Sequence, residues 1–165
     1  MTILVAYASK HGSTAGIARR IGERLGERGH QVNLRSVDEI ERLDEPEAVV
    51  LGSAVYAGSW RKEAVTLAER HGDELWRIPV WLFSSGPLGD RVVDEEEQPR
   101  QLEDLRRSIA PRDHRIFAGA LDIGALSFGE RMIVKAVKAP GGDFRDWDEI
   151  DAWADEIAVA LHRGG

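Results

Sequence analysis

A turn rich in hydroxyl groups separates the first apolar segment of the chain from a helical pattern. It reads Ser9-Lys10-His11-Gly12-Ser13-Thr14. Glycine permits a tight turn, and the first N–H groups of a helix have no partner inside the helix. These donors, the positive end of the helix dipole and the hydroxyls of Ser9, Ser13 and Thr14 favour an anion. The turn therefore predicts a phosphate site to which Lys10 and His11 add backbone amides, and the alternative is a helix cap without a ligand.

The motifs of other phosphate-binding turns are missing at this position. The sequence has no G-x-x-x-x-G-K-[ST], and no G-x-G-x-x-G follows the first apolar segment. Those patterns hold the phosphates of nucleoside triphosphates and of dinucleotides. Both classes of ligand are therefore disfavoured.

Two later loops carry residues that suit a flat aromatic ring. The loop over residues 52–60 contains Tyr56, whose side chain can stack on such a ring. Trp60, at its end, is expected to contact that ring, to pack on a neighbouring helix or to make a surface contact. The loop over residues 84–90 is rich in glycine and serine, and its backbone amides can face polar ring atoms. The residues expected to line the ring are Ala54, Val55, Tyr56, Ala57 and Gly58, and those expected at its polar edge are Ser85, Gly86 and Gly89.

These loops need a scaffold that brings them together, and the pattern of the chain supplies one. Short apolar runs alternate with helical stripes, which is typical of a parallel sheet with covering helices. We expect an α/β fold, a doubly wound five-stranded parallel sheet of order 2-1-3-4-5 with helices on both faces. Ligands of such sheets bind beyond the carboxyl ends of the strands, where the strand order reverses. The expected strands are Ile3–Ala8, Gln31–Ser36, Ala48–Ser53, Val80–Ser85 and Arg115–Leu121. The expected helices are Thr14–Arg28, Arg61–Leu75, Gln98–Ile109 and a last one that begins with Asp146 and Glu149 as a capping pair.

Composition limits the class of protein. A chain of 165 residues is the size of one domain, and we expect a single domain over residues 1–165 with an extra segment at about 122–143. The absence of cysteine excludes disulfides, thiolate metal sites and thiol catalysis, and no metal site is expected. The formal net charge of −7 argues against nucleic acid and favours basic protein partners. No apolar run reaches the ~20 residues of a membrane-spanning helix, and we expect a cytoplasmic protein.

The first turn resembles the phosphate signature of flavodoxins, T/S-x-T-G-x-T/S. Ser9, Gly12 and Thr14 match that signature, and His11 stands where a threonine is usual. The resemblance implies a flavodoxin-like fold and noncovalent FMN as the cofactor, with electron transfer between redox partner proteins. A receiver domain, which shares this strand order, needs acidic residues after the first strand and an aspartate at the end of the third. Those places hold Ser9, Lys10 and Ser53, so that class is excluded.

The C-terminal third is similar to the flavodoxin-fold protoporphyrinogen dehydrogenases that use menaquinone. The similar segments are 117–121, 132–138, 141–142 and 146–147. This resemblance implies oxidation of protoporphyrinogen IX with a quinone acceptor and peripheral contact with the inner face of a membrane. Arg131, Lys135 and Lys138 form one stripe of a helix, which could meet substrate propionates, anionic lipid or solvent alone. An electron shuttle and an interaction module without cofactor remain the alternatives.

Overall fold

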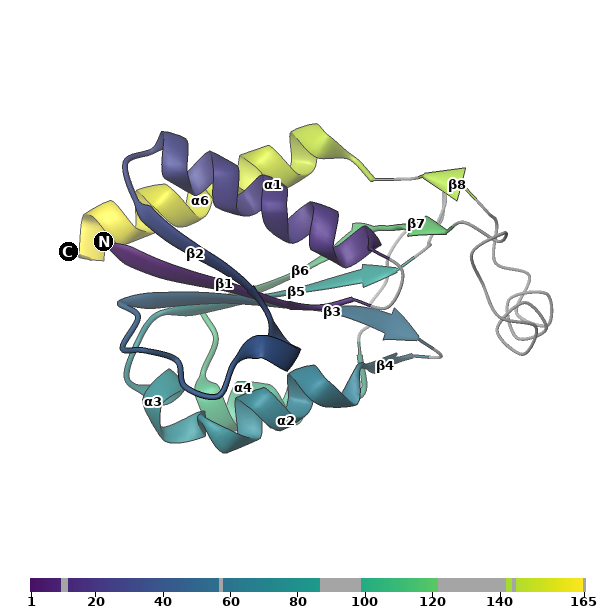
Figure 1. The fold of residues 1–165 in the computed structure, drawn as a ribbon, viewed down its shortest axis with the longest axis horizontal. Helices are drawn as coiled ribbons and strands as arrows, with labels where there is room; N and C mark the ends of the chain where they lie inside the picture. The colour runs from purple at the N-terminus through teal and green to yellow at the C-terminus, as the bar shows by residue number, and fades with distance from the viewer. Residues whose placement is uncertain (10–11, 57, 87–98, 122–141, 144, 165) are drawn as a thin grey trace.

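The computed structural model describes residues 1–9, 12–56, 58–86, 99–121, 142–143 and 145–164. Its centre is a parallel sheet with the strand order β2-β1-β3-β5-β6 (Figure 1). The strands are β1 (Thr2–Ala8), β2 (Gln31–Ser36), β3 (Ala48–Tyr56), β5 (Val80–Gly86) and β6 (Asp113–Ala118). Renumbered without the short strand β4, this is the expected order 2-1-3-4-5. The expected fold class is therefore confirmed.

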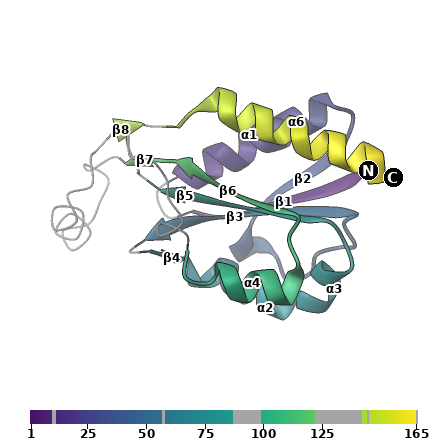
Figure 2. The ribbon, with the colours of Figure 1, turned by 180° about the vertical axis from the view of Figure 1, so that it is seen from behind.

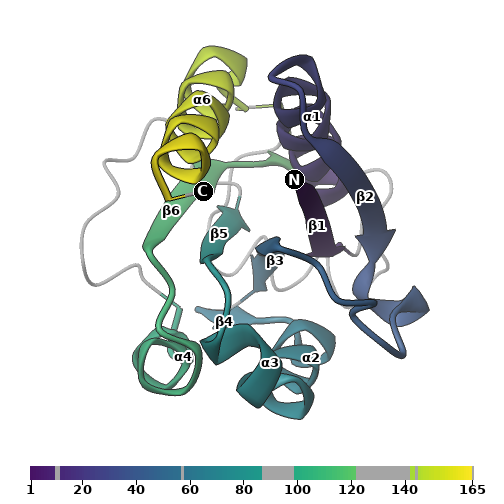
Figure 3. The same cartoon turned by 90° about the vertical axis from the view of Figure 1, so that its left-hand side faces the viewer.

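Helices cover both faces of the sheet (Figures 1 and 3). Helices α1 (Ser13–Glu27) and α6 (Trp147–Gly164) lie side by side on one face. Helices α2 (Lys62–Arg70), α3 (Gly72–Trp76) and α4 (Leu102–Ile109) lie on the other, and a 3-10 turn, η1 (Val37–Glu39), follows β2. Seen from behind, the chain termini lie at the end of the sheet opposite the carboxyl ends of the strands (Figure 2). That arrangement leaves the carboxyl edge to the loops.

Each face of the sheet has its own apolar core, as expected for strands that are apolar on successive residues. In β1, Ile3 and Val5 pack under α1 and α6, whereas Leu4 and Ala6 pack toward α2 and α4. Aromatic rings fill the first core, where Phe83, Phe117 and Trp153 contact one another edge-on or tilted.

Several boundaries differ from the sequence-based expectation. Strand β3 runs to Tyr56 rather than ending at Ser53, so residues 54–56, expected in a loop, lie in the strand. The expected helix Arg61–Leu75 is broken at His71, whose backbone leaves helical geometry just before Gly72, a weak helix former. The helix expected from Gln98 begins at Leu102. The last strand of the sheet ends at Ala118, and β7 (Ala120–Leu121) pairs with β8 (Gly142–Asp143) instead. Ser59 and Trp60, expected in a loop, form β4 against β3.

The start of α6 agrees with the expected capping pair. The backbone N–H of Glu149 donates to Oδ1 of Asp146 at 3.1 Å. An aspartate at this position satisfies one of the free donors of the first turn. The acidic residues Asp148 and Glu149 in the same turn also suit the positive end of the helix dipole.

Candidate functional site

The candidate site lies at the carboxyl edge of the sheet, where the strand order reverses between β1 and β3. Neighbouring strands end in register there: Ala8 lies beside Ser53, and Ala54 lies beside Ser85. The hydroxyl turn leaves β1 at this edge and enters α1. The three loops singled out in the sequence thus come from adjacent strands.

The turn before α1 depends on a glycine in the left-handed region. Gly12 has φ of 87°, a conformation that costs other residues about 1–2 kcal/mol. Its N–H donates to Oγ of Ser9 at 3.1 Å, and its carbonyl accepts the N–H of Gly16 at 3.0 Å. Ser9 thereby fixes the turn and keeps its own hydroxyl proton available for donation. Lys10 and His11, expected in the same site, lie outside the described residues.

Thr14 is the residue of this turn whose environment most clearly indicates a bound ligand. Its side chain is 1 % exposed, and its Oγ1 has no hydrogen-bond partner among the residues that the structure describes. A buried hydroxyl without a partner costs about 1–3 kcal/mol. The hydroxyl lies in the first turn of α1, whose N–H groups and dipole favour an anion. These donors fit a bound phosphate.

A glycine that the sequence analysis did not assign to the site joins the first turn of α1 to the end of β5. A Cβ atom on Gly119 would lie 3.0 Å from Oγ of Ser13 and 3.0 Å from Oγ of Ser85. Two of the expected site residues therefore meet at Gly119, and any larger residue would crowd them. In the sequence, the run of small residues 118–120 near the end of an expected strand is the feature that could have indicated this close packing.

The loop after β3 is a hairpin that turns at Gly58. Val55 pairs with Trp60 and Tyr56 with Ser59, and Gly58 has φ of 79°. A Cβ on Gly86 would lie 3.9 Å from Cβ of Val55, so the end of β5 runs beside this hairpin. Val55 of the expected ring-lining segment and Gly86 of the expected polar edge are thus neighbours. Ala57, Gly89 and the side chain of Tyr56 lie outside the described residues.

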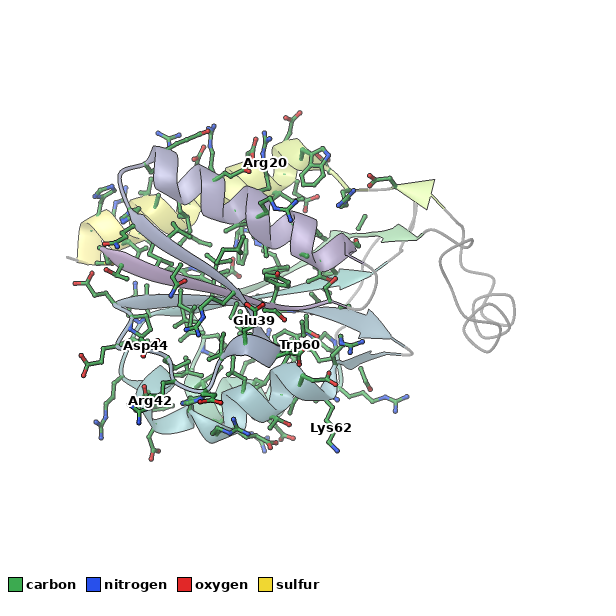
Figure 4. All side chains as sticks on the ribbon, in the orientation of Figure 1. Arg20, Glu39, Arg42, Asp44, Trp60 and Lys62 are labelled. Atoms are coloured by element: carbon green, nitrogen blue, oxygen red, sulfur yellow. The ribbon has the colours of Figure 1, made fainter. Side chains whose placement is uncertain are left out.

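Trp60 is held in the core rather than presented at the loop surface. Its side chain is buried, and its indole Nε1 donates to Oγ of Ser84 at 2.7 Å. It lies on the α2 side of the sheet (Figure 4) and belongs to the same apolar core as Ala64 and Leu67. Of the three expectations for this residue, helix packing agrees with the structure.

Ser84 also reaches a histidine on β6. Its Oγ lies 2.7 Å from Nε2 of His114. Burial, aided by the positive charge of Arg106, lowers the pKa of His114 to about 4, against a smaller opposing effect of Asp113. The ring is therefore neutral near pH 7, and Nε2 is free to accept the Ser84 hydroxyl proton.

Two other expectations concern the rest of the chain. The basic stripe of Arg131, Lys135 and Lys138 lies outside the described residues. Within the described part, the helices are too short or too polar to cross a membrane. No group of three or more histidine, aspartate or glutamate side chains in that part is placed to hold a metal ion.

Comparison with known proteins agrees with the fold described above. A family model described as a flavodoxin domain matches residues 4–148. None of the curated protein sequences matches the chain significantly.

Several solved structures share the fold. A flavodoxin from the domain Archaea is 18% identical with a TM-score of 0.63, and the match covers 98% of this chain and 99% of that one. A mutant of flavodoxin from Pseudomonas aeruginosa is 16% identical with a TM-score of 0.59, covering 98% and 99%. Rubredoxin oxygen:oxidoreductase from Desulfovibrio gigas is 15% identical with a TM-score of 0.66. That match covers 98% of this chain but 36% of the other, so the chain spans about a third of that protein.

Proposed function

The chain belongs to the flavodoxin domain family, and from that membership we propose that it is an FMN-dependent electron-transfer protein. FMN is the cofactor to which the family match points, and two of the structures described above are flavodoxins. When bound, FMN supplies the one-electron and two-electron redox chemistry that no side chain offers. The protein supplies position and electrostatics.

The single observation that carries the proposal is the buried Oγ1 of Thr14 at the start of α1, which has no hydrogen-bond partner in the described part of the chain. It lies in the turn that matches a phosphate signature, at the edge of the sheet where ligands of this fold bind. We propose that this turn holds the phosphate through Ser9, Lys10, His11, Gly12, Ser13 and Thr14. The ring would lie against residues 54–58, with Ser85, Gly86 and Gly89 at its polar edge.

The charge of the protein suits a redox partner with a basic surface. The formal net charge is −7, which accelerates association with positively charged proteins and favours their docking. The negative charge of the protein also disfavours the additional negative charge of a reduced flavin, so the reduction potential of the bound FMN should be low. We therefore propose a donor of low-potential electrons to a basic acceptor protein.

Oxidation of protoporphyrinogen IX with a quinone is the second candidate. Its support is the similarity of residues 117–121 and 146–147 to the protoporphyrinogen dehydrogenases, together with the basic stripe at 131–138. The flavodoxin relatives favour the electron shuttle over this enzyme activity.

Three experiments test the proposals in sequence. The purified protein is first titrated with FMN while flavin absorbance and fluorescence are recorded. Quenched fluorescence with a defined stoichiometry supports the cofactor, whereas a protein that stays colourless would favour a cofactor-free interaction module.

The loaded protein is then reduced anaerobically and mixed with cytochrome c, a basic one-electron acceptor. Incubation of the oxidised form with protoporphyrinogen and a quinone separates the two functions, because a pure shuttle gives no porphyrin fluorescence above background.

A further inference from the structure

Arg145, which lies between β8 and α6, is held in a fixed orientation by its neighbours. Its Nε and Nη2 donate to the two carboxylate oxygens of Asp143 at 3.0 and 2.7 Å. Its guanidinium also lies over the ring of Trp147, with 4.8 Å between its Cζ and the ring centroid. The side chain is 19 % exposed. A guanidinium held in this way loses little conformational freedom when it binds a further group.

The remaining nitrogen of this guanidinium points at the start of α1. A Cβ atom on Gly16 would lie 2.5 Å from Nη1 of Arg145. In a helix, each Cα–Cβ bond is tilted toward the N-terminus, so the space in front of Gly16 lies over the preceding turn. That turn contains Gly12, Ser13 and Thr14. Asp143 accepts from Nε and Nη2, and Nη1 makes no hydrogen bond to any of the described residues.

The start of a helix disfavours a nearby positive side chain and favours an anion. The N-terminus of a helix carries a partial positive charge, and a positive side chain near it is destabilising. The first turn of α1 contains no acidic residue that would offset this effect. Asp143 neutralises part of the charge of Arg145, but it lies on β8 and does not satisfy the helix donors. The hydroxyl of Thr14 in the same turn is buried and unpaired among the described residues.

We propose that Arg145 donates through Nη1 to the phosphate of FMN and makes the site selective for the phosphorylated flavin. This inference rests on the proposed function. The phosphate would then receive a charged donor from the C-terminal part of the chain in addition to the turn at Gly12. Asp143 is a positioning residue for this contact, and Gly16 leaves the space through which the guanidinium reaches the helix start.

The test compares dissociation constants for FMN and for riboflavin, which has the same ring and no phosphate. We expect Arg145→Gln to weaken FMN at least about tenfold, as for the loss of a charged hydrogen bond, and to leave riboflavin unchanged. Gly16→Ala should reduce the affinity for FMN selectively as well, because its methyl group displaces the guanidinium while alanine suits a helix. Fluorescence quenching measures both affinities without any assay of activity.

Arg20→Gln is the matched control. Arg20 makes the same two-point contact with Asp151, at 2.6 and 2.7 Å, one turn farther along α1. Its replacement should change neither affinity. Equal losses for FMN and riboflavin in Arg145→Gln, or no loss for either, would overturn the role of Arg145 while the cofactor proposal stood. A parent protein that binds neither flavin would overturn both.

Discussion

Oγ of Ser84 and Nε2 of His114 lie 2.7 Å apart, between two adjacent strands of the sheet. The indole N–H of Trp60 donates to the same oxygen, so a hydrogen-bonded series of three side chains links the hairpin after β3 to the outer strand β6. Since indole only donates, Ser84 accepts from Trp60 and has its own proton for His114. The Ser84 hydroxyl can donate only to an unprotonated Nε2, and the lowered pKa of His114 keeps its ring neutral near pH 7.

Acidification should therefore destabilise the protein through His114. The folded-state pKa of about 4 lies below the unfolded value of 6.5, so the folded state binds fewer protons between these limits. The free energy of unfolding should rise with pH in that window and fall as the pH drops from 6.5 to 4. We expect a loss of about 2 kcal/mol, less than the full shift corresponds to because the ring is partly exposed. Urea unfolding at a series of pH values measures it.

His114→Gln keeps an acceptor for Ser84 and removes the titration. The slope of stability against pH should flatten in this variant between pH 4 and 6.5. Burial also lowers the pKa of His30, so His30→Gln should remove a separate part of the same slope. A slope that His114→Gln leaves intact would contradict the assignment.

Thr14→Val should separate ligand binding from folding. Valine has nearly the same shape as threonine without the hydroxyl, so it removes the buried Oγ1 that no described residue satisfies. We expect the flavin-free protein to become more stable by about 1 kcal/mol, because an unsatisfied polar group is gone. The affinity for FMN should fall about tenfold or more, because the hydroxyl is no longer there to donate to the phosphate.

Thr14→Ser is the control for that variant. It retains the hydroxyl and should keep most of the affinity for FMN, with lower stability from the lost methyl group. Urea unfolding of the flavin-free protein and fluorescence titration with FMN give the two quantities. If the valine variant binds FMN as tightly as the parent, Thr14 does not contact the phosphate.

Gly52 should tolerate no side chain, although its backbone is in an extended strand. A Cβ atom there would overlap the ring of Phe83, its partner on β5. Overpacking of a buried core typically costs about 1–3 kcal/mol, so Gly52→Ala should lower the free energy of unfolding by that amount. In the double variant Gly52→Ala/Phe83→Leu, the loss of stability should be smaller than the sum of the losses in the two single variants. The smaller leucine side chain leaves room for the added methyl group.

Gly26→Ala provides a glycine with the opposite outcome. It lies in α1, and apart from the adjoining helix backbone no atom of the described residues lies within 4 Å of the added Cβ, so alanine should stabilise the helix by up to about 1 kcal/mol. A destabilised Gly26→Ala, or a Gly52→Ala variant as stable as the parent, would contradict the packing described here.

The sheet order could be predicted from the sequence because its determinants are local. Runs such as Val49–Leu51 are apolar on successive residues, and the connections between strands are too long for hairpins. The three loops at the carboxyl edge follow from that order. The break at His71 and the hairpin at Gly58 depend on local geometry that the apolar pattern does not reveal.

The roles of Gly119 and Arg145 could not be predicted, because they arise from contacts between distant parts of the chain. Gly119 meets Ser13 and Ser85, and Arg145 meets Gly16, more than 100 residues away in sequence. Neither pairing follows from the spacing of residues along one element. The unpaired hydroxyl of Thr14 is likewise visible only once the burial of that side chain is known.

The contact between α1 and α6 should be sensitive to salt and acid through Asp155. Its two carboxylate oxygens accept from Nε and Nη2 of Arg24 at 2.9 Å each, and Nε of Arg28 adds a bond at 3.0 Å. Hydrogen bonds from these arginines hold the pKa of Asp155 well below its usual range. The stabilisation is therefore present above the unfolded pKa of 3.8 and is lost as the pH falls through the folded value.

Asp155→Asn should lower the melting temperature at low ionic strength and neutral pH by a few degrees. The difference from the parent should shrink in about 1 M NaCl, where screening extends to roughly 3 Å, and in strong acid, where the parent aspartate is protonated as well. Glu156→Gln is the matched control, because Glu156 makes one exposed pair with Arg115 at 3.0 Å. Isolated surface pairs contribute about 0–1 kcal/mol, so this neighbour should change the melting temperature little. Equal effects of the two variants would mean that the shared contacts of Asp155 add nothing beyond a single surface pair.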